Sequence, residues 1–206
     1  MNDNKITISR GNSKMGEIPS VSLPPVITCA NGCKCAKDCY AVKLCRIYKS
    51  VKTSYDRNLT VYQTDPAEYW RQVEKTVSVS RFFRFHVSGD IPDAGYFAEM
   101  VRLARRNPHC EMLVFTKKYA LVNEWVWWHG AQSESVPQNL HLIFSAWDGM
   151  PMHNPYGFPV SHVHFKDDPE APESWKRCSG NCLDCARAGL NCWTMGTGDH
   201  VVFEKH

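Results

Sequence analysis

The sequence lacks any apolar run near the ~18 residues that a membrane-spanning helix requires, so we expect no membrane insertion. Its first residues are polar and contain no signal-peptide stretch, which favours a cytoplasmic location. Repeats and low-complexity tracts are also missing, and twelve glycines and twelve prolines are ordinary numbers for 206 residues. These absences predict one soluble domain of usual size.

Cysteine, in contrast, is abundant: there are ten in the chain, and nine fall into two short clusters. The first cluster contains Cys29, Cys33, Cys35, Cys39 and Cys45, and the second contains Cys178, Cys182, Cys185 and Cys192. A secreted disulfide scaffold is usually shorter and spreads its cysteines between its elements. Dense thiol clusters in a reducing compartment instead indicate metal or iron–sulfur ligands, with disulfides as the alternative.

The hydrophobic pattern alternates between the strand period and the helix period. We expect strands at 5–9, 82–88, 111–116, 140–146 and 160–165. We expect helices at 65–77, 93–107 and 120–129, and a mostly helical segment at 37–63. Strands that alternate with helices predict right-handed parallel crossovers. The expected fold is therefore an α/β domain, a partial or open (β/α) barrel with parallel strands and a C-terminal cysteine-rich appendage.

We divide this single domain, residues 1–206, into three segments. They are an N-terminal cysteine loop with helices at 1–64, a β/α core at 65–173 and a cysteine-rich segment at 174–206. The four cysteines of the last segment suffice for a complete all-thiolate site, and their spacing does not separate zinc from an iron–sulfur cluster. Cys178, Cys182 and Cys185 match the CxxxCxxC spacing of radical S-adenosylmethionine enzymes. This match lies at the wrong end of the chain, and Asp184 replaces the aromatic residue usual before the last cysteine.

Polar residues follow the first two core strands. His86-Val87-Ser88-Gly89-Asp90 ends one strand, and Thr116-Lys117 ends the next. Ligands of parallel α/β folds bind at these carboxyl ends, and the Ser-Gly-Asp turn resembles in placement the Gly-Gly-Glu turn of radical S-adenosylmethionine enzymes. A tight turn with an Asx-type cap is the alternative interpretation, and Lys117 can equally be a solvated lysine.

The segment 34–57 is strongly basic, with seven Lys or Arg against two Asp, a local charge of +5. Three tyrosines interleave with these charges, a pattern that can hold nucleic acid. A solvated helix face, or charge compensation for a thiolate-ligated cluster, explains the same pattern. The chain's net charge of +3 does not require a polyanionic partner.

Taken in order, these motifs resemble the phage-encoded gene product 88 family. The matching set is Cys29, Cys35, Cys39-Tyr40-Ala41, Tyr55, Asn58, His86-Val87-Ser88-Gly89-Asp90, Phe115-Thr116-Lys117 and the C-terminal cysteines up to Cys192-Trp193. The resemblance selects Cys29, Cys35 and Cys39 as cluster ligands and leaves Cys33 and Cys45 as extras. Members of the family look like diverged, minimal radical S-adenosylmethionine barrels, and the resemblance supplies no substrate.

The first hypothesis is therefore an iron–sulfur protein of the radical S-adenosylmethionine type, or a relic of one. The expected metal ligands are Cys29, Cys35, Cys39, Cys178, Cys182, Cys185 and Cys192, holding one or two [4Fe–4S] clusters. The expected cofactor-binding residues are Ser88, Gly89, Asp90 and Thr116, and the catalytic candidates are His86, Asp90 and Lys117. S-adenosylmethionine would bind the open iron, with a small molecule as substrate. The standard CxxxCxxC is missing from the N-terminal loop, which counts against radical chemistry.

The second hypothesis is a non-enzymatic module that binds zinc or a cluster and contacts nucleic acid or a host protein through 34–57. The third is electron transfer by the cluster alone.

Overall fold

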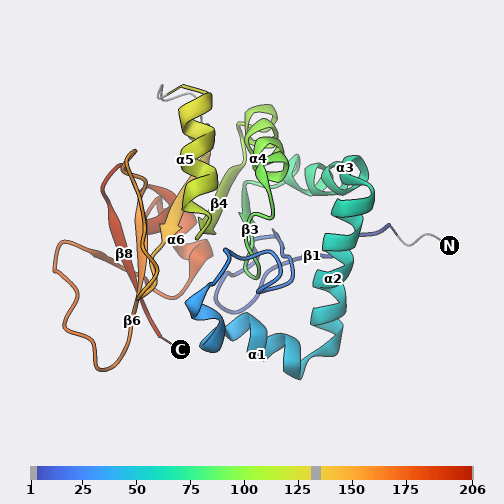
Figure 1. Ribbon diagram of the computed structural model, residues 1–206. Coiled ribbons are helices and arrows are strands. Elements are labelled where there is room, and N and C mark those ends of the chain that lie inside the picture. The colour runs from blue at the N-terminus through green and yellow to red at the C-terminus, as the bar shows by residue number, and fades with distance from the viewer. Residues whose placement is uncertain (1–3, 131–135, 206) are drawn as a thin grey trace.

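The computed structural model describes residues 4–130 and 136–205, and its centre is an open β-sheet (Figure 1). The described residues form eight strands in the order β1-β2-β3-β4-β5-β6-β8-β7. Their bounds are β1 Ile8–Ser9, β2 Ser20–Val21, β3 Phe82–Phe85, β4 Glu111–Thr116, β5 Leu140–Ser145, β6 Val160–His164, β7 Lys176–Arg177 and β8 His200–Glu204. Every neighbouring pair is parallel except β1 and β2. The predicted α/β class with parallel strands is confirmed, but β1 and β7 remain as edges and the sheet does not close into a barrel.

The predicted core helices are present with their ends close to the predicted positions. Their bounds are α1 Tyr40–Ile47, α2 Lys49–Thr64, α3 Pro66–Val77, α4 Ala94–Arg106 and α5 Tyr119–Trp128. Helix α6, Cys182–Ala188, was not predicted from the sequence, and short 3-10 turns lie at Lys34–Lys37 and Asn191–Trp193. The Asp65 side chain caps α3 as its sequence predicts, accepting a hydrogen bond from the Glu68 amide at 3.1 Å. The helical segment predicted at 37–63 is broken, because Tyr48 is extended (φ −109°, ψ 97°), and α1 and α2 meet at an angle in Figure 1.

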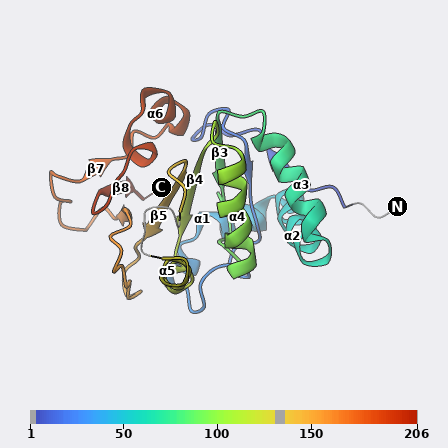
Figure 2. The same ribbon diagram turned by 90° about the horizontal axis from the view of Figure 1, so that it is seen from above.

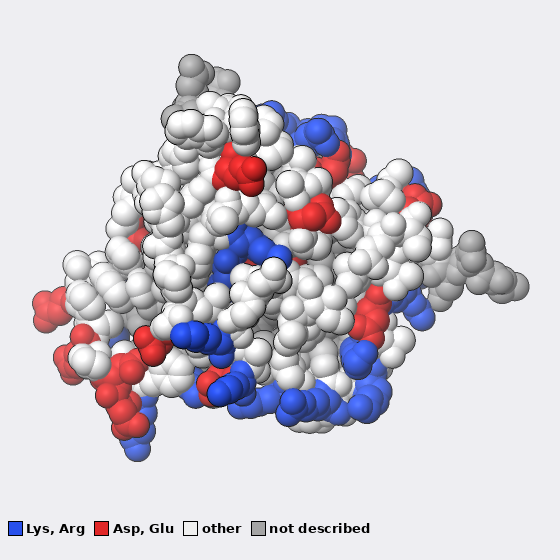
Figure 3. All heavy atoms as spheres, in the orientation of Figure 1, with Lys and Arg blue, Asp and Glu red and all other residues white. Residues whose placement is uncertain are grey.

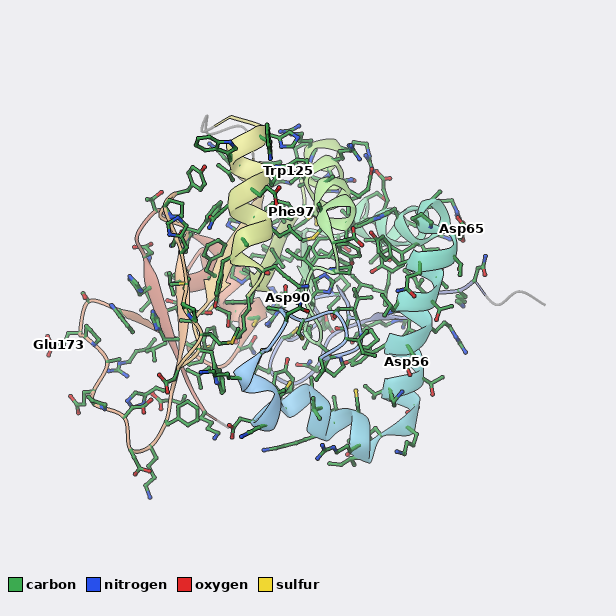
Figure 4. The ribbon with its side chains drawn as sticks, viewed as in Figure 1. Asp56, Asp65, Asp90, Phe97, Trp125 and Glu173 are labelled. Carbon is green, nitrogen blue, oxygen red and sulfur yellow. A yellow bond between two sulfur atoms is a disulfide. The ribbon has the colours of Figure 1, made fainter. Side chains whose placement is uncertain are left out.

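Both faces of the sheet are covered, by different parts of the chain (Figure 2). Helices α3, α4 and α5 pack on one face over the larger core, and α6 lies on the other. The continuous apolar run of β4 follows from this arrangement, since Met112 and Val114 face the larger core and Leu113 faces α6. Helices α4 and α5 contact one another through Phe97 and Trp125, labelled in Figure 4, whose ring centroids are 5.6 Å apart.

The C-terminal segment is part of the sheet, which corrects the expectation of an appendage. Strand β8 inserts between β6 and β7, in parallel register with both. The sequence analysis did not predict β8, because His200–Glu204 is short and follows a glycine-rich loop. The strand predicted at 82–88 also ends early, at Phe85, because His86 has a left-handed backbone (φ 56°).

Among residues 4–130 and 136–205, no helix combines the length and the apolar character that a membrane span requires.

Candidate functional site

The carboxyl ends of β3, β4 and β5 lie at one edge of the sheet, where Figure 4 labels Asp90. The buried Asp90 carboxylate accepts hydrogen bonds from the Thr116 hydroxyl at 2.6 Å and from the Lys117 amide at 2.8 Å. Burial raises the pKa of Asp90, and these hydrogen bonds act in the opposite direction. Asp90 therefore ties the end of β3 to the end of β4.

The Ser88-Gly89-Asp90 turn holds the loop that leads to Cys29. The Ser88 hydroxyl donates to the Leu23 carbonyl at 3.1 Å, and the Asp90 amide donates to the Thr28 hydroxyl at 3.1 Å. Gly89 has φ +78°, and a Cβ there would lie 2.6 Å from Thr28 Oγ1 and 2.7 Å from the Leu23 carbonyl oxygen. The polar groups of Ser88 and Thr116, predicted to hold a cofactor, are thus engaged within the chain. What they position is the first cysteine loop.

Two free thiols reach this edge from opposite ends of that loop. Cys29 follows Thr28, and its sulfur accepts a hydrogen bond from the Val26 amide at 3.3 Å. Cys39 is the residue before α1, where the helix N-terminus favours a negatively charged group. Burial raises the pKa of Cys29; the Val26 amide lowers it, and the nearby charges of Asp90 and Cys39 raise it further.

Lys117 supplies the positive charge beside these thiols. Its ammonium donates to the Ser145 hydroxyl at 2.7 Å and lies 5.8 Å from the centre of the Trp147 ring. Burial lowers the pKa of Lys117, while the charges of Asp90, Cys29 and Cys39 raise it. Figure 3 shows a small group of basic side chains near the middle of this face, within a mostly uncharged surround. The edge thus combines two thiols, a buried carboxylate and a partly buried ammonium group.

Cys35, predicted as a metal ligand, is not a free thiol in the structure. Its sulfur is bonded to that of Cys33 in a disulfide whose Cα atoms are 5.4 Å apart. The reason is local, because a separation of two residues at the 3-10 turn Lys34–Lys37 brings the two side chains together. A disulfide sulfur is not a thiolate ligand, so Cys35 can bind a metal only after reduction.

His86, a catalytic candidate, directly follows β3, but its ring is buried against the larger core. Its ring packs against Tyr96 and Phe85, with centroids 5.3 and 5.9 Å apart. Neither ring nitrogen has a hydrogen-bond partner among the described residues, and burial lowers the pKa of His86 to about 3. The imidazole is therefore neutral at pH 7. The structure brings Asp90 and Lys117 together but separates His86 from them.

The second cysteine cluster gathers on the α6 face of the sheet. Burial, together with the charges of Cys178, Cys182 and Cys185, raises the pKa of Cys192 to about 12, while the charge of Arg84 acts in the opposite direction. The Cys185 sulfur lies 3.0 Å from the Ser179 hydroxyl. All four thiols are free and close enough to repel one another as thiolates.

Sequence reasoning missed Arg84, which comes from β3 to meet this cluster. Its guanidinium donates to the Cys182 sulfur at 3.6 Å and lies 5.0 Å from the centre of the Phe115 ring. Its buried Nε atom has no partner among the described groups. The sequence contained a signal for this role. In the strand FFRF, Phe83 and Phe85 point to one face, so Arg84 must point to the other, and a charged residue inside an apolar strand indicates a partner there.

Tyr40 lies close enough to both cysteine clusters for their charges to act on its hydroxyl. Its side chain is 57% exposed, but its hydroxyl points inward and donates to the Val87 carbonyl. Burial of the hydroxyl raises the pKa of Tyr40; the charge of Arg84 lowers it, and those of Cys39 and Cys182 raise it. The two clusters therefore approach one another without merging. Nowhere in 4–130 or 136–205 do three His, Cys, Asp or Glu side chains form a ready metal-ligand group.

A cavity of about 600 Å³ opens at the opposite edge of the sheet, among the amino ends of β3, β4 and β5. Its lining includes Arg81, Trp193 and the pair His141–Glu111, whose side chains are 2.7 Å apart. None of the predicted site residues lines it. The predicted cofactor-binding residues Ser88, Gly89, Asp90 and Thr116 lie instead at the carboxyl edge.

Fold and site together define an α/β protein whose open, mostly parallel sheet bears free thiols at its carboxyl edge and four more on one face. The chain belongs to the gene product 88 family, whose model matches residues 1–197. This is the family that the ordered motifs resemble. No curated protein and no solved structure matches the chain.

Proposed function

We propose that this chain is an iron–sulfur protein of the radical S-adenosylmethionine type, or a relic of one. The observation that supports this most directly is the convergence of the free thiols Cys29 and Cys39 beside Asp90 and Lys117. They meet at the carboxyl edge of a parallel sheet, where α/β proteins bind their ligands. Cys35 would be the third ligand, and three thiolates would leave one iron of a [4Fe–4S] cluster open.

Such a cluster requires reduction of the Cys33–Cys35 disulfide, because only then can Cys35 act as a third thiolate ligand. That step takes two electrons and two protons from a thiol reductant, which becomes the oxidised disulfide, and yields two thiols. The cluster with S-adenosylmethionine would supply radical chemistry, on a small-molecule substrate. The chain's own contribution is positional and electrostatic. The turn at Gly89 fixes the Cys29 loop, and the Lys117 ammonium would offset the negative charge that the thiols carry when they bind a metal.

The second candidate is a non-enzymatic module that holds zinc or a cluster at its C-terminal cysteines. A specific observation favours it: Cys178, Cys182, Cys185 and Cys192 are free thiols, the charges of the first three act on Cys192, and four is the number of thiolates that a closed site needs. Arg84 places a compensating positive charge against Cys182. In the iron–sulfur proposal the same four cysteines hold a second cluster.

The test is anaerobic purification under reducing conditions, followed by iron, sulfide and zinc analysis and a visible absorption spectrum. We expect about four iron and four sulfide per chain for one cluster and about eight of each for two. Cys39→Ala should lose one cluster's iron, whereas the matched control Cys110→Ala should keep it, because Cys110 is fully buried and far from both clusters in sequence. Addition of S-adenosylmethionine should change the spectrum of the wild-type cluster.

A colourless protein with stoichiometric zinc under strict anaerobiosis would end the iron–sulfur proposal and favour the zinc module. Zinc lost from Cys185→Ala but kept in Cys39→Ala would assign that metal to the C-terminal thiols. Full iron content in both Cys39→Ala and Cys110→Ala would show that the N-terminal ligand set is wrong.

A further inference from the structure

One edge of the molecule is strongly basic. Figure 3 shows Lys and Arg side chains along the lower edge, where Figure 1 places α1 and the lower end of α2, with acidic side chains gathered at the lower left. The segment 34–57 carries +5 while the whole chain carries +3, so the remaining residues sum to −2. The basic charge is therefore concentrated on this edge, which defines a surface for a polyanion.

Much of this charge is free of ion pairs. Lys52 is bonded to Asp56, and the other acid of the segment, Asp38, is bonded to Lys205. Lys43, Arg46 and Lys49 are exposed and form no ion pair within residues 4–130 and 136–205. These three cations surround the junction where α1 ends and α2 begins.

An apolar groove of about 250 Å³ runs beside these cations. Its walls are the loop 24–27 on one side and α1 and α2 on the other, with Arg46 and Lys49 at its rim. Ile27 in the groove is 70% exposed, and Tyr48, which lies outside the groove at the helix junction, is 54% exposed. Exposed apolar and aromatic side chains next to cations are typical of surfaces on which bases stack and phosphates pair.

We propose that this surface binds a single strand of nucleic acid, with a base in the groove beside Ile27 and phosphates on Lys43, Arg46 and Lys49. A duplex presents the same phosphates but keeps its bases paired, so it would leave the apolar groove unfilled. An acidic protein would match the charge but not require the aromatic ring of Tyr48. The surface adjoins the thiol edge, because Cys39 directly precedes α1, but the binding itself does not depend on a cofactor.

The experiment measures fluorescence anisotropy of labelled DNA and RNA single strands of about 20 nucleotides, longer than the ~4–16 that one such site covers. The variant Lys43→Glu/Arg46→Glu/Lys49→Glu should lower affinity at least about tenfold at ~0.1 M salt. Its slope of log K against log salt should be smaller by about 2, since each phosphate contact on a single strand contributes about 0.7. Tyr48→Ala should weaken binding about tenfold through lost stacking.

The matched control is Arg10→Glu/Lys75→Glu/Lys166→Glu, which changes the net charge equally at exposed positions on other elements. Circular dichroism checks that every variant is folded. Equal loss in the control, equal affinity for a duplex of the same sequence, or equally effective competition by polyglutamate would each overturn the proposal. Binding retained by Cys39→Ala after its iron is lost would show that the surface acts independently of the proposed cluster.

Discussion

At the scale of single residues, the carboxyl edge depends on one glycine. Gly89 adopts φ +78°, and its missing side chain lets the loop at Thr28 and Leu23 lie directly against the turn. The Thr28 hydroxyl then accepts a hydrogen bond from the Asp90 amide, which holds the following residue, Cys29, near the turn. The Ser-Gly-Asp turn was recognisable in the sequence, but its partner was not, because Thr28 lies 62 residues before Asp90. Contacts between distant segments leave no local pattern.

Gly89→Ala should lower the free energy of unfolding considerably more than its matched control, Gly198→Ala. Both glycines have nearly the same backbone, φ +78° and +79°, but a Cβ at Gly198 would meet nothing within 4 Å. We expect a loss of about 1–2 kcal/mol in the free energy of unfolding for Gly198→Ala, from the left-handed backbone alone. For Gly89→Ala we expect about 2–5 kcal/mol, because overpacking adds to it. Urea denaturation measures both, and equal losses would refute the close approach.

At the scale of elements, the ends of helices were more predictable than their breaks. Asp65 and the following Pro66 mark the start of α3 in the sequence, and the structure uses both. The break at Tyr48 between α1 and α2 carries no such signal, since the apolar period continues through it. The break belongs to the tertiary structure. The bend between α1 and α2 exposes Tyr48, and the exposed basic residues lie on both helices around it.

Helix α6 provides a test of how an element supports the second cysteine cluster. The Asn181 side chain accepts hydrogen bonds from the amides of Leu183 and Asp184 at 3.0 and 3.2 Å, and Cys182 and Cys185 lie on this helix. Asn181→Ala should lower the free energy of unfolding by about 0.5–2 kcal/mol, whereas Asn181→Ser should restore most of it. Hydrogen exchange should quicken at residues 182–188. No change in exchange there would mean that the cap does not hold α6.

At the scale of the whole molecule, the two ends of the chain complete one sheet. Strands β1 and β2 extend it beyond β3, and β8 extends it beyond β6. The central alternation of strand and helix was predictable, because each unit carries its own hydrophobic period. Short strands such as β2 and β8 were not, because two to five residues contain too little pattern, and their partners lie far away in sequence.

The stability of the whole molecule should depend on pH through the buried His86. Its pKa falls from 6.5 to about 3 on folding, so between these values the unfolded chain binds a proton that the folded protein does not. The free energy of unfolding therefore falls as the pH falls. From about pH 6 to pH 5 the wild type should lose about 1 kcal/mol more than His86→Asn, a substitution that tolerates the left-handed backbone.

Urea denaturation at each pH measures this difference. The raised pKa of Asp90 acts in the opposite direction, but Asp90 is unchanged in both proteins and its contribution cancels in the comparison. The exposed His153 serves as the control position, and His153→Asn should follow the wild type. Parallel curves for wild type and His86→Asn would show that the imidazole is not buried as a neutral group.

The sequence by itself determined the α/β class, the Asp65 cap of α3, the basic segment and the two cysteine clusters, because each depends on residues close together in the chain. Only the tertiary structure decided that Cys29 and Cys39 converge, that Cys35 is bonded to Cys33 and that His86 turns into the core. It also brought Arg84 to Cys182 across 98 residues. These outcomes depend on which buried surfaces meet, and that is a property of packing between distant segments.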